Sequence, residues 1–230
     1  MIKLLVSDYD GTYKTIDGSI KTNNDKLHKF MQIHKFMIST GRNYTEFYPE
    51  IYKYYLDATY YSLAEGNVLL DKNLNIIKIN TMPYNFIINF KEFYSHFDMI
   101  ETINAYGDKS HTEIVEYKIL YKNLEIKKKF IQFLLKNQIF SYHHNFENPL
   151  ECHISNPYIN KVDAIINVSN IDSIAKPNIY TIGDGYNDVK MIHDFNGYAI
   201  SGAKQKVKEI AKGKYNSVGE LADDIIKGLI

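Results

Sequence analysis

The chain has a single cysteine, no tryptophan and no excess of charge of either sign. With one cysteine, Cys152, neither an intramolecular disulfide nor a cysteine-rich zinc site is possible. The 27 Lys and Arg residues balance 27 Asp and Glu residues, and the basic residues are scattered. This composition gives no electrostatic reason to expect binding to nucleic acid or to an anionic membrane surface. We therefore expect a small-molecule partner.

Long apolar runs are also missing. No stretch approaches the roughly 20 apolar residues of a membrane span, and the segment after Met1 lacks the charged and apolar regions of a secretory signal. From these two absences we expect a soluble, cytoplasmic protein. At 230 residues, of which 45% are hydrophobic, the chain is long enough for one large domain or for a core with an insertion.

Strand and helix patterns alternate over residues 1–80. The predicted strands are 2–6, 35–40 and 58–63, followed by a hairpin of 68–70 and 76–79, and the predicted helices are 22–31 and 44–55. Such alternation is typical of an α/β fold with a doubly wound, mainly parallel, Rossmann-like sheet. The same style returns after residue 156, with a strand ending at Gly183, a helix from Asn187, a strand over 198–200 and two terminal helices.

The pattern differs between about residues 81 and 155. Helices are predicted over 83–97 and 123–136, and strands near 98–106, 112–121, 138–143 and 150–155. This α-β-β-α-β-β order fits a small α+β module better than a continued doubly wound sheet. We therefore predict a core of residues 1–80 and 156–230 with an inserted domain at 81–155.

Acidic residues follow two of the predicted core strands. Asp8 and Asp10 come directly after the first strand, and Asp184 and Asp188 come after the strand that ends at Gly183. Open α/β sheets keep their ligands at the carboxyl ends of the strands, and a convergence of carboxylates calls for a cation. We predict an Mg²⁺ site formed by Asp8, Asp10, Asp184 and Asp188, in which Asp8 and Asp184 are the natural ligands and Asp188 orients them.

The two leading carboxylates are candidates for two of the groups that phosphoryl transfer needs, a nucleophile and a proton donor for the leaving oxygen. Asp8 is placed to attack phosphorus and form an aspartyl phosphate, and Asp10 to protonate the leaving oxygen and later activate water. Gly11 lets the backbone approach the phosphate.

Groups for binding the phosphate lie elsewhere. The Thr40 hydroxyl and the amides of Gly41 and Arg42 stand where a strand ends and a helix is expected to begin. Lys161, at the start of another predicted helix, supplies fixed positive charge. Lys176, followed by Pro177 at the approach to the last core strand, is the alternative, and we favour Lys161 because it opens a helix.

Four motifs together resemble those of a known family. They are Asp8-Tyr9-Asp10-Gly11-Thr12, Ser39-Thr40-Gly41-Arg42, Lys161 and Gly183-Asp184-Gly185-Tyr186-Asn187-Asp188. Their order and spacing resemble the haloacid dehalogenase-like (HAD) hydrolases, specifically the Cof-type phosphatases. The resemblance implies a Mg²⁺-dependent phosphatase that uses a phosphoaspartate intermediate, adds Asn187 to the predicted site, and implies that residues 81–155 form a class IIB cap that selects a small phosphate ester such as a sugar phosphate.

Two other functions remain open on these residues: a phosphomutase, and a receiver-like regulatory phosphoacceptor. A dehalogenase is disfavoured because the second Asp matches the phosphatase pattern. The chain departs from the family at Tyr13, at Glu65-Gly66-Asn67, which replaces the common Asn-Gly-Ala turn, and at Val162. The sequence names neither the substrate nor the oligomeric state.

Histidines and aromatics of the predicted cap have simpler interpretations. We interpret His143, His144 and His153 as a cap-strand surface rather than a metal site. His111, in a cap loop, is a candidate for facing the substrate, although an exposed loop histidine usually has no such role. Cys152 is expected to be a small packed residue, and the aromatic residues between Phe86 and Phe97 are expected to form the cap core.

Overall fold

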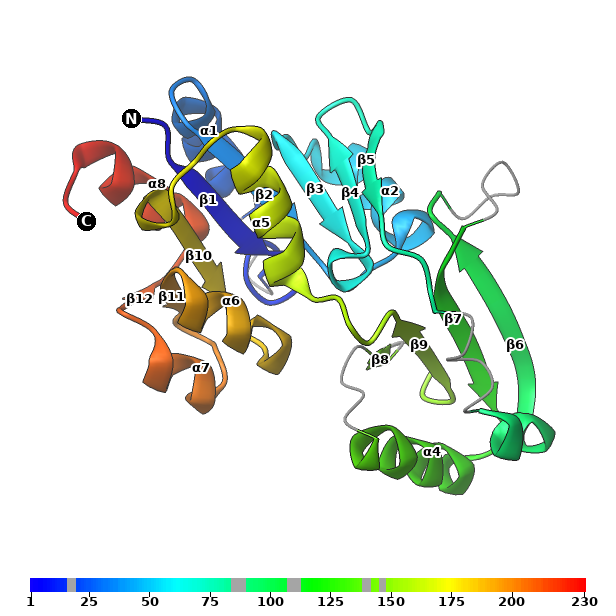
Figure 1. The fold of residues 1–230 in the computed structure, drawn as a ribbon. Coiled ribbons are helices and arrows are strands. Elements are labelled where there is room, and N and C mark those ends of the chain that lie inside the picture. The colour runs from blue at the N-terminus through cyan, green and yellow to red at the C-terminus, as the bar shows by residue number, and fades with distance from the viewer. Residues whose placement is uncertain (16–19, 84–89, 107–112, 138–141, 145–147) are drawn as a thin grey trace.

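Two sheets of different size organise the molecule. The computed structural model describes residues 1–15, 20–83, 90–106, 113–137, 142–144 and 148–230. The larger sheet has eight strands in the order β12-β11-β10-β1-β2-β3-β4-β5 (Figure 1). Their bounds are β1 Leu4–Asp8, β2 Lys35–Ser39, β3 Tyr60–Leu63, β4 Val68–Asp71, β5 Ile76–Ile79, β10 Ile179–Gly183, β11 Asn196–Ile200 and β12 Lys214–Tyr215.

Strand direction in this sheet is mainly parallel. Every neighbouring pair from β12 to β3 is parallel, and β4 and β5 add an antiparallel edge. All residues of β1 are buried, as expected for a central parallel strand covered on both faces. The helices are α1 Ile20–Met31, α2 Tyr44–Tyr54, α5 Lys161–Ile171, α6 Val189–Asp194, α7 Gln205–Ile210 and α8 Val218–Lys227, with 3-10 turns η1 Ala64–Gly66, η3 Lys176–Asn178 and η4 Tyr186–Asp188.

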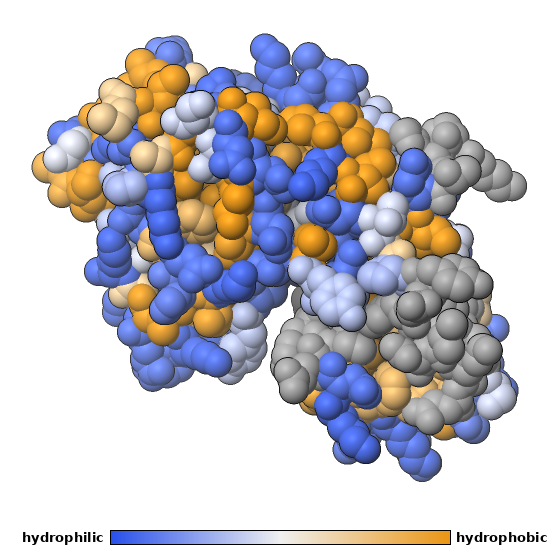
Figure 2. Space-filling view, viewed as in Figure 1, coloured by the Kyte–Doolittle hydropathy of each residue, from blue (hydrophilic) through white to orange (hydrophobic). Residues whose placement is uncertain are grey.

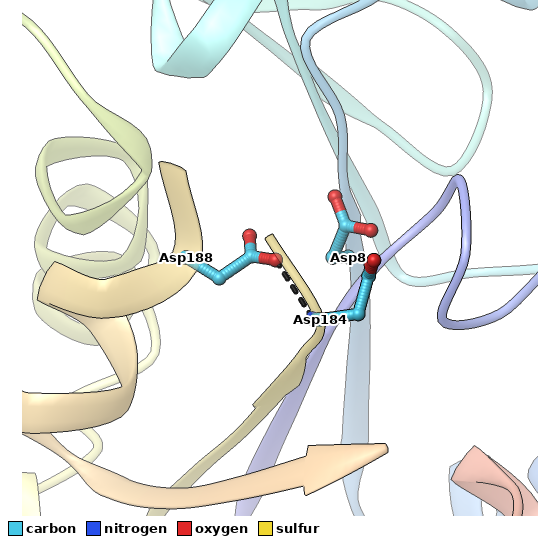
Figure 3. A group of neighbouring side chains, drawn as sticks. All are labelled: Asp8, Asp184 and Asp188. Carbon is cyan, nitrogen blue, oxygen red and sulfur yellow. Dashed lines mark hydrogen bonds between the residues drawn. The ribbon is translucent and has the colours of Figure 1, made fainter. Parts of the chain in front are cut away.

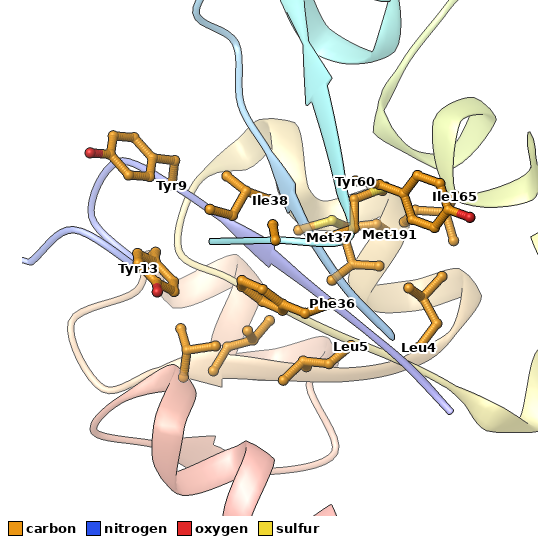
Figure 4. Packing of buried hydrophobic residues seen from close by; sticks show 14 of the residues in the cluster. Leu4, Leu5, Tyr9, Tyr13, Phe36, Met37, Ile38, Tyr60, Ile165 and Met191 are labelled. Atoms are coloured by element: carbon orange, nitrogen blue, oxygen red, sulfur yellow. The ribbon is translucent and has the colours of Figure 1, made fainter. Parts of the chain in front are cut away.

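Apolar side chains of the central strands form the main core. Leu4 and Leu5 of β1 pack with Phe36 and Met37 of β2, and all four are fully buried (Figure 4). The short apolar runs that predicted these strands are therefore the runs that fill the interior. Within the described ranges, no helix has the length and apolar character needed to cross a membrane.

The second sheet has four antiparallel strands in the order β6-β7-β9-β8. Its elements are η2 Lys91–His96, β6 Phe97–Asn104, β7 Ile114–Tyr121, α4 Leu124–Lys136, β8 Tyr142–His144 and β9 Glu151–Ser155. A separate hydrophobic cluster, including Phe97, Phe130 and Cys152, lies under this sheet. Figure 2 shows the two lobes joined along one side, with a notch open between them below the junction. These strands fall within the segment 81–155 that we propose as the inserted domain.

The predicted fold class is confirmed, and three local predictions differ from the structure. The helix expected over 83–97 is not continuous: residues 91–96 form a 3-10 helix, Phe97 begins a strand, and residues 84–89 lie outside the described part of the chain. The helix expected from Asn187 begins with the 3-10 turn η4, and α6 starts at Val189. A two-residue strand, β12, lies between the terminal helices.

Candidate active site

The strand order points to the carboxyl ends of β1 and β10 as the candidate site. The chain runs from β1 to β2 on one side of the sheet, whereas β10 is followed by β11 on the other. The topology therefore reverses between β1 and β10, and ligands of open α/β sheets bind at such a point. Asp8 is the last residue of β1 and Asp184 follows β10 directly. Both strands point toward the side where the smaller sheet lies (Figure 1).

Three carboxylates meet at these strand ends. Oxygen atoms of Asp8, Asp184 and Asp188 lie within 4.8 Å of one another (Figure 3). Asp8 and Asp188 are buried, with 5% and 0% of their surface exposed. Burial, with the neighbouring charges of Asp188 and Asp184, raises the pKa of Asp8 well above its usual value, and burial raises that of Asp184. The group thus carries unfavourable negative charge that a cation would relieve.

Among the residues that the structure describes, Lys161 is the lysine that touches this group. Its Nζ donates to Asp8 Oδ1 at 2.5 Å and to Asp188 Oδ1 at 2.7 Å. Although burial alone would lower the pKa of Lys161, the charges of Asp188 and Asp8 raise it well above its usual value. Lys161 begins α5, where Asn160 and Asp163 form a capping box that fixes the helix start.

One ammonium does not balance three carboxylates. The donor set is composed of oxygen atoms, which Mg²⁺ prefers, so the residues present fit the predicted divalent cation. Lys176, the alternative to Lys161, lies in η3 with its Nζ over the Phe195 ring, away from the carboxylates.

Asp188 holds the loop after β10 in shape. Its Oδ2 accepts the backbone N–H groups of Asp184, at 3.0 Å, and Gly185, at 2.9 Å. The first of these bonds is the dashed line in Figure 3. Since its other oxygen accepts from Lys161, Asp188 is placed to orient the loop that carries Asp184.

Asp184 is in turn positioned by the loop after β1. Thr12 Oγ1 donates to Asp184 Oδ1 at 2.9 Å. Gly11 adopts φ +87°, and a Cβ there would lie 2.7 Å from Asp184 Oδ2. Only glycine fits both the backbone conformation and the space at this position.

Asp10 does not join the three carboxylates. Its two oxygens accept from Arg42 Nε and Nη2, each at 2.7 Å, in a bidentate pair. Arg42 also lies 3.9 Å from Glu50 Oε1 and over the ring of Tyr9. The structure thus brings Asp8, Asp184 and Asp188 together as predicted and places the Asp10 carboxylate with Arg42 instead.

Groups of the predicted phosphate-binding turn already make hydrogen bonds to other residues of the protein. Thr40 is buried, and its Oγ1 accepts the Arg42 amide at 3.1 Å. Helix α2 begins at Tyr44 with Asn43 as its N-cap, so Gly41 and Arg42 precede the helix rather than start it. The Arg42 amide and guanidinium therefore both have partners in this arrangement.

Two buried acids near the site were not among the predicted residues. Glu65 accepts a hydrogen bond from Asn187 Nδ2 at 3.0 Å. Glu50 accepts from Tyr9 Oη at 2.7 Å and from Lys14 Nζ at 2.6 Å. Glu65 had a sequence signal, the departure from the Asn-Gly-Ala turn, whereas nothing local marks Glu50 within α2.

The interpretation of His153 as a surface residue is wrong. His153 is 2% exposed, and its ring lies 3.2 Å from Glu116 Oε2 and 2.9 Å from Glu151 Oε1. Asn43 Nδ2 donates to the same Glu116 oxygen at 2.7 Å. This cluster joins the smaller sheet to the start of α2, a long-range contact that the strand pattern does not reveal.

The other cap predictions have mixed outcomes. Cys152 is buried, which confirms its packing role. His143 and His144 lie on β8 beside β9. His111 and Phe86 lie outside the described residues.

Comparison with known families now decides the membership of the chain. A family model described as haloacid dehalogenase-like hydrolase matches residues 5–117 and 91–220. This protein belongs to the haloacid dehalogenase-like hydrolases. The family predicted from the four motifs is therefore confirmed.

Solved structures show the same fold at low sequence identity. A HAD/COF-like hydrolase from Plasmodium vivax aligns with TM-score 0.75 and 16% identity over 98% of this chain and 96% of its own. A protein from Thermotoga maritima gives TM-score 0.76 and 14% identity, with 97% of each chain covered. A phosphatase of the HAD superfamily from Bacteroides thetaiotaomicron gives 0.73 and 18%, covering 100% of this chain and 96% of its own. No curated protein matches this chain.

Proposed function

We propose that this HAD-like hydrolase is a Mg²⁺-dependent phosphatase that hydrolyses a small phosphomonoester through a phosphoaspartate on Asp8. The observation that carries the proposal is the position of Asp8 at the end of β1, where it contacts Lys161 at 2.5 Å and has carboxylate oxygens of Asp184 and Asp188 within 4.8 Å. A nucleophile, a fixed cation and a set of hard oxygen donors thus lie together at one edge of the sheet, as phosphoryl transfer requires.

The proposed chemistry has two steps. A carboxylate oxygen of Asp8 attacks phosphorus, the bond to the ester oxygen breaks, and Asp10 protonates the departing alcohol. Asp10 then takes a proton from water as the water attacks the phosphoaspartate, so that inorganic phosphate leaves and Asp8 is restored.

The groups around Asp8 and Asp10 would balance the charge of the phosphate and hold it in position. Lys161 offsets the charge on the phosphoryl oxygens, and Thr40 and Asn187 line the same strand ends. Asp8 and Asp184 would hold Mg²⁺, and Asp188 orients the loop that carries Asp184. The bound ion would offset the negative charge of the phosphate and favour attack. Gly41 and Arg42 stay in the proposed phosphate-binding group, and for Arg42 this requires that its amide leave Thr40 or its guanidinium leave Asp10 when phosphate arrives.

The smaller sheet is the proposed cap. Residues 81–155 carry it, and Glu116 and His153 place it against the start of α2. A cap at this position would select the alcohol part of the substrate, and a sugar phosphate is our first choice.

The decisive experiment compares wild type, Asp8→Asn and the control Asp25→Asn, an exposed change on α1. With p-nitrophenyl phosphate and Mg²⁺, we expect turnover by wild type and the control, and a loss of about 1,000-fold or more in Asp8→Asn. Full activity in Asp8→Asn would overturn the assignment.

A panel of sugar phosphates would then identify the substrate class. An isomeric product without free phosphate would replace the proposal with a phosphomutase, and a phosphoenzyme lasting minutes would replace it with a phosphoacceptor.

A further inference from the structure

The turn after β3 has an unusual backbone. Ala64, Glu65 and Gly66 adopt φ of +50°, +56° and +97° in succession. Residues that carry a Cβ rarely adopt this left-handed conformation, because the Cβ approaches the carbonyl oxygen. Such strain persists where the surrounding contacts enforce it.

The contacts of this turn reach two segments of the candidate site through the backbone. Ala64 N–H donates to Arg42 O at 2.8 Å, and Glu65 N–H donates to Thr40 O at 3.1 Å. Gly66 packs against the start of α5, where an added Cβ would lie 2.5 Å from Asn160 O. The turn therefore touches both the phosphate-binding segment and the helix start that carries Lys161.

The Glu65 side chain reaches a third segment. It is buried, with 7% of its surface exposed, and its Oε1 accepts from Asn187 Nδ2 at 3.0 Å. Asn187 lies in η4, next to Asp188, which contacts both Lys161 and the Asp184 backbone. A buried carboxylate has a large desolvation cost, so its place here needs a compensating role.

We propose that Glu65 is a positioning residue for the reaction, which fixes the Asn187 amide by this hydrogen bond and so holds η4 in register with Lys161. The inference rests on the proposed phosphatase function. Glu65 acts through Asn187 rather than on the substrate, so its loss lowers kcat and leaves KM nearly unchanged. The charge of Glu65 also raises the pKa of Lys161, and Glu65→Gln separates that charge from the hydrogen bond, to which we assign the effect.

Three variants test this role with p-nitrophenyl phosphate and Mg²⁺. Glu65→Gly removes the side chain and the hydrogen bond to Asn187 while relieving the left-handed backbone, so the relief of strain offsets part of the stability lost with the bond, and thermal unfolding shows that the variant is folded. We expect its kcat to fall by about tenfold or more, with KM within about threefold. Glu65→Gln keeps an acceptor for Asn187 and should retain kcat within about threefold of wild type. Ser173→Gly, an exposed left-handed position (φ +53°) outside the site, is the matched control and should keep full activity.

The possible results distinguish failure of the role assigned to Glu65 from failure of the proposed function. Wild-type kcat in Glu65→Gly, an equal loss in Glu65→Gln, or a rise in KM without a fall in kcat would each overturn the role assigned to Glu65. If wild type itself shows no Mg²⁺-dependent turnover, the proposed function fails, and the Glu65–Asn187 bond is then read from urea unfolding. Asn187→Ala should lower the urea midpoint in the wild-type background and not in Glu65→Gly. Equal shifts in both backgrounds would show that the two side chains are not coupled.

Discussion

Lys161 Nζ and Asp8 Oδ1 lie 2.5 Å apart, although 153 positions separate the two residues in the chain. Both side chains are buried, and Lys161 also contacts Asp188. A buried ammonium between two carboxylates is stable only while the pairing is intact, because removal of one partner leaves uncompensated charge in the interior.

Lys161→Ala should therefore be costly to both activity and stability. We expect kcat to fall by about 100-fold or more, since a fixed charge next to the reacting phosphate is lost. Unfolding in urea without metal should show a loss of about 3 kcal/mol, the usual cost of breaking a buried pair. Lys176→Ala, which removes an exposed lysine, is the control. A larger activity loss in the control would reassign the phosphate-binding lysine.

Magnesium should stabilise the folded protein. Binding at Asp8 and Asp184 neutralises carboxylates whose pKa values burial already raises. At an Mg²⁺ concentration about 100 times its Kd, the stabilisation should reach about 2.7 kcal/mol, seen as a rise in the unfolding temperature. A chelator should reverse the rise and abolish turnover. Asp184→Asn should show little or no rise, and an undiminished rise in that variant would place the metal elsewhere.

Gly11→Ala tests the tight approach of the β1 loop to Asp184. An added Cβ requires an unfavourable left-handed backbone and lies 2.7 Å from Asp184 Oδ2. We expect a loss of about 1–3 kcal/mol in the free energy of unfolding, with a higher Mg²⁺ concentration needed for half-maximal activity. Gly202→Ala, where an added Cβ meets no atom within 4 Å, is the matched control. If Gly11→Ala and Gly202→Ala showed similar dependence of activity on Mg²⁺, Gly11 would have no role in the metal site.

The contact between the two sheets should respond to alkaline pH. Burial alone would lower the pKa of His153, but Glu116, Glu46 and Glu151 raise it to about 9. Glu116 lies on β7, Glu151 on β9 beside Lys118, and Glu46 on α2. A pKa raised above the unfolded value of 6.5 contributes stability that is fully present below about pH 6.5 and is lost as the pH rises through about 9.

His153→Gln should remove this part of the pH dependence. The contribution at low pH is up to about 3 kcal/mol, and urea unfolding between pH 6 and 9.5 measures it as the difference between wild type and variant. His193→Gln, at an exposed histidine, should follow the wild-type curve. Parallel curves for wild type and His153→Gln would show that the ring is not charged in the folded protein.

Local sequence patterns predicted the strands and the residues at their ends. They did not predict which side chains pair over long distances in the chain. Asp8 and Asp184 were found because short apolar runs end beside them and parallel strands share one carboxyl edge. The pairing of Asp10 with Arg42 depends on how two loops pack, and the burial of His153 depends on how one sheet meets α2. Neither has a periodic signal in the chain. Glu65 was visible only as a departure from a common turn, without any sign of its partner Asn187.

The neighbours of β1 have a consequence for biosynthesis. One edge of β1 pairs with β10, which begins only at Ile179. During synthesis this edge of β1 therefore stays unpaired until most of the chain has been made. An exposed strand edge is a template for mispairing. Truncation before Ile179 should therefore yield an aggregation-prone fragment rather than a smaller working enzyme.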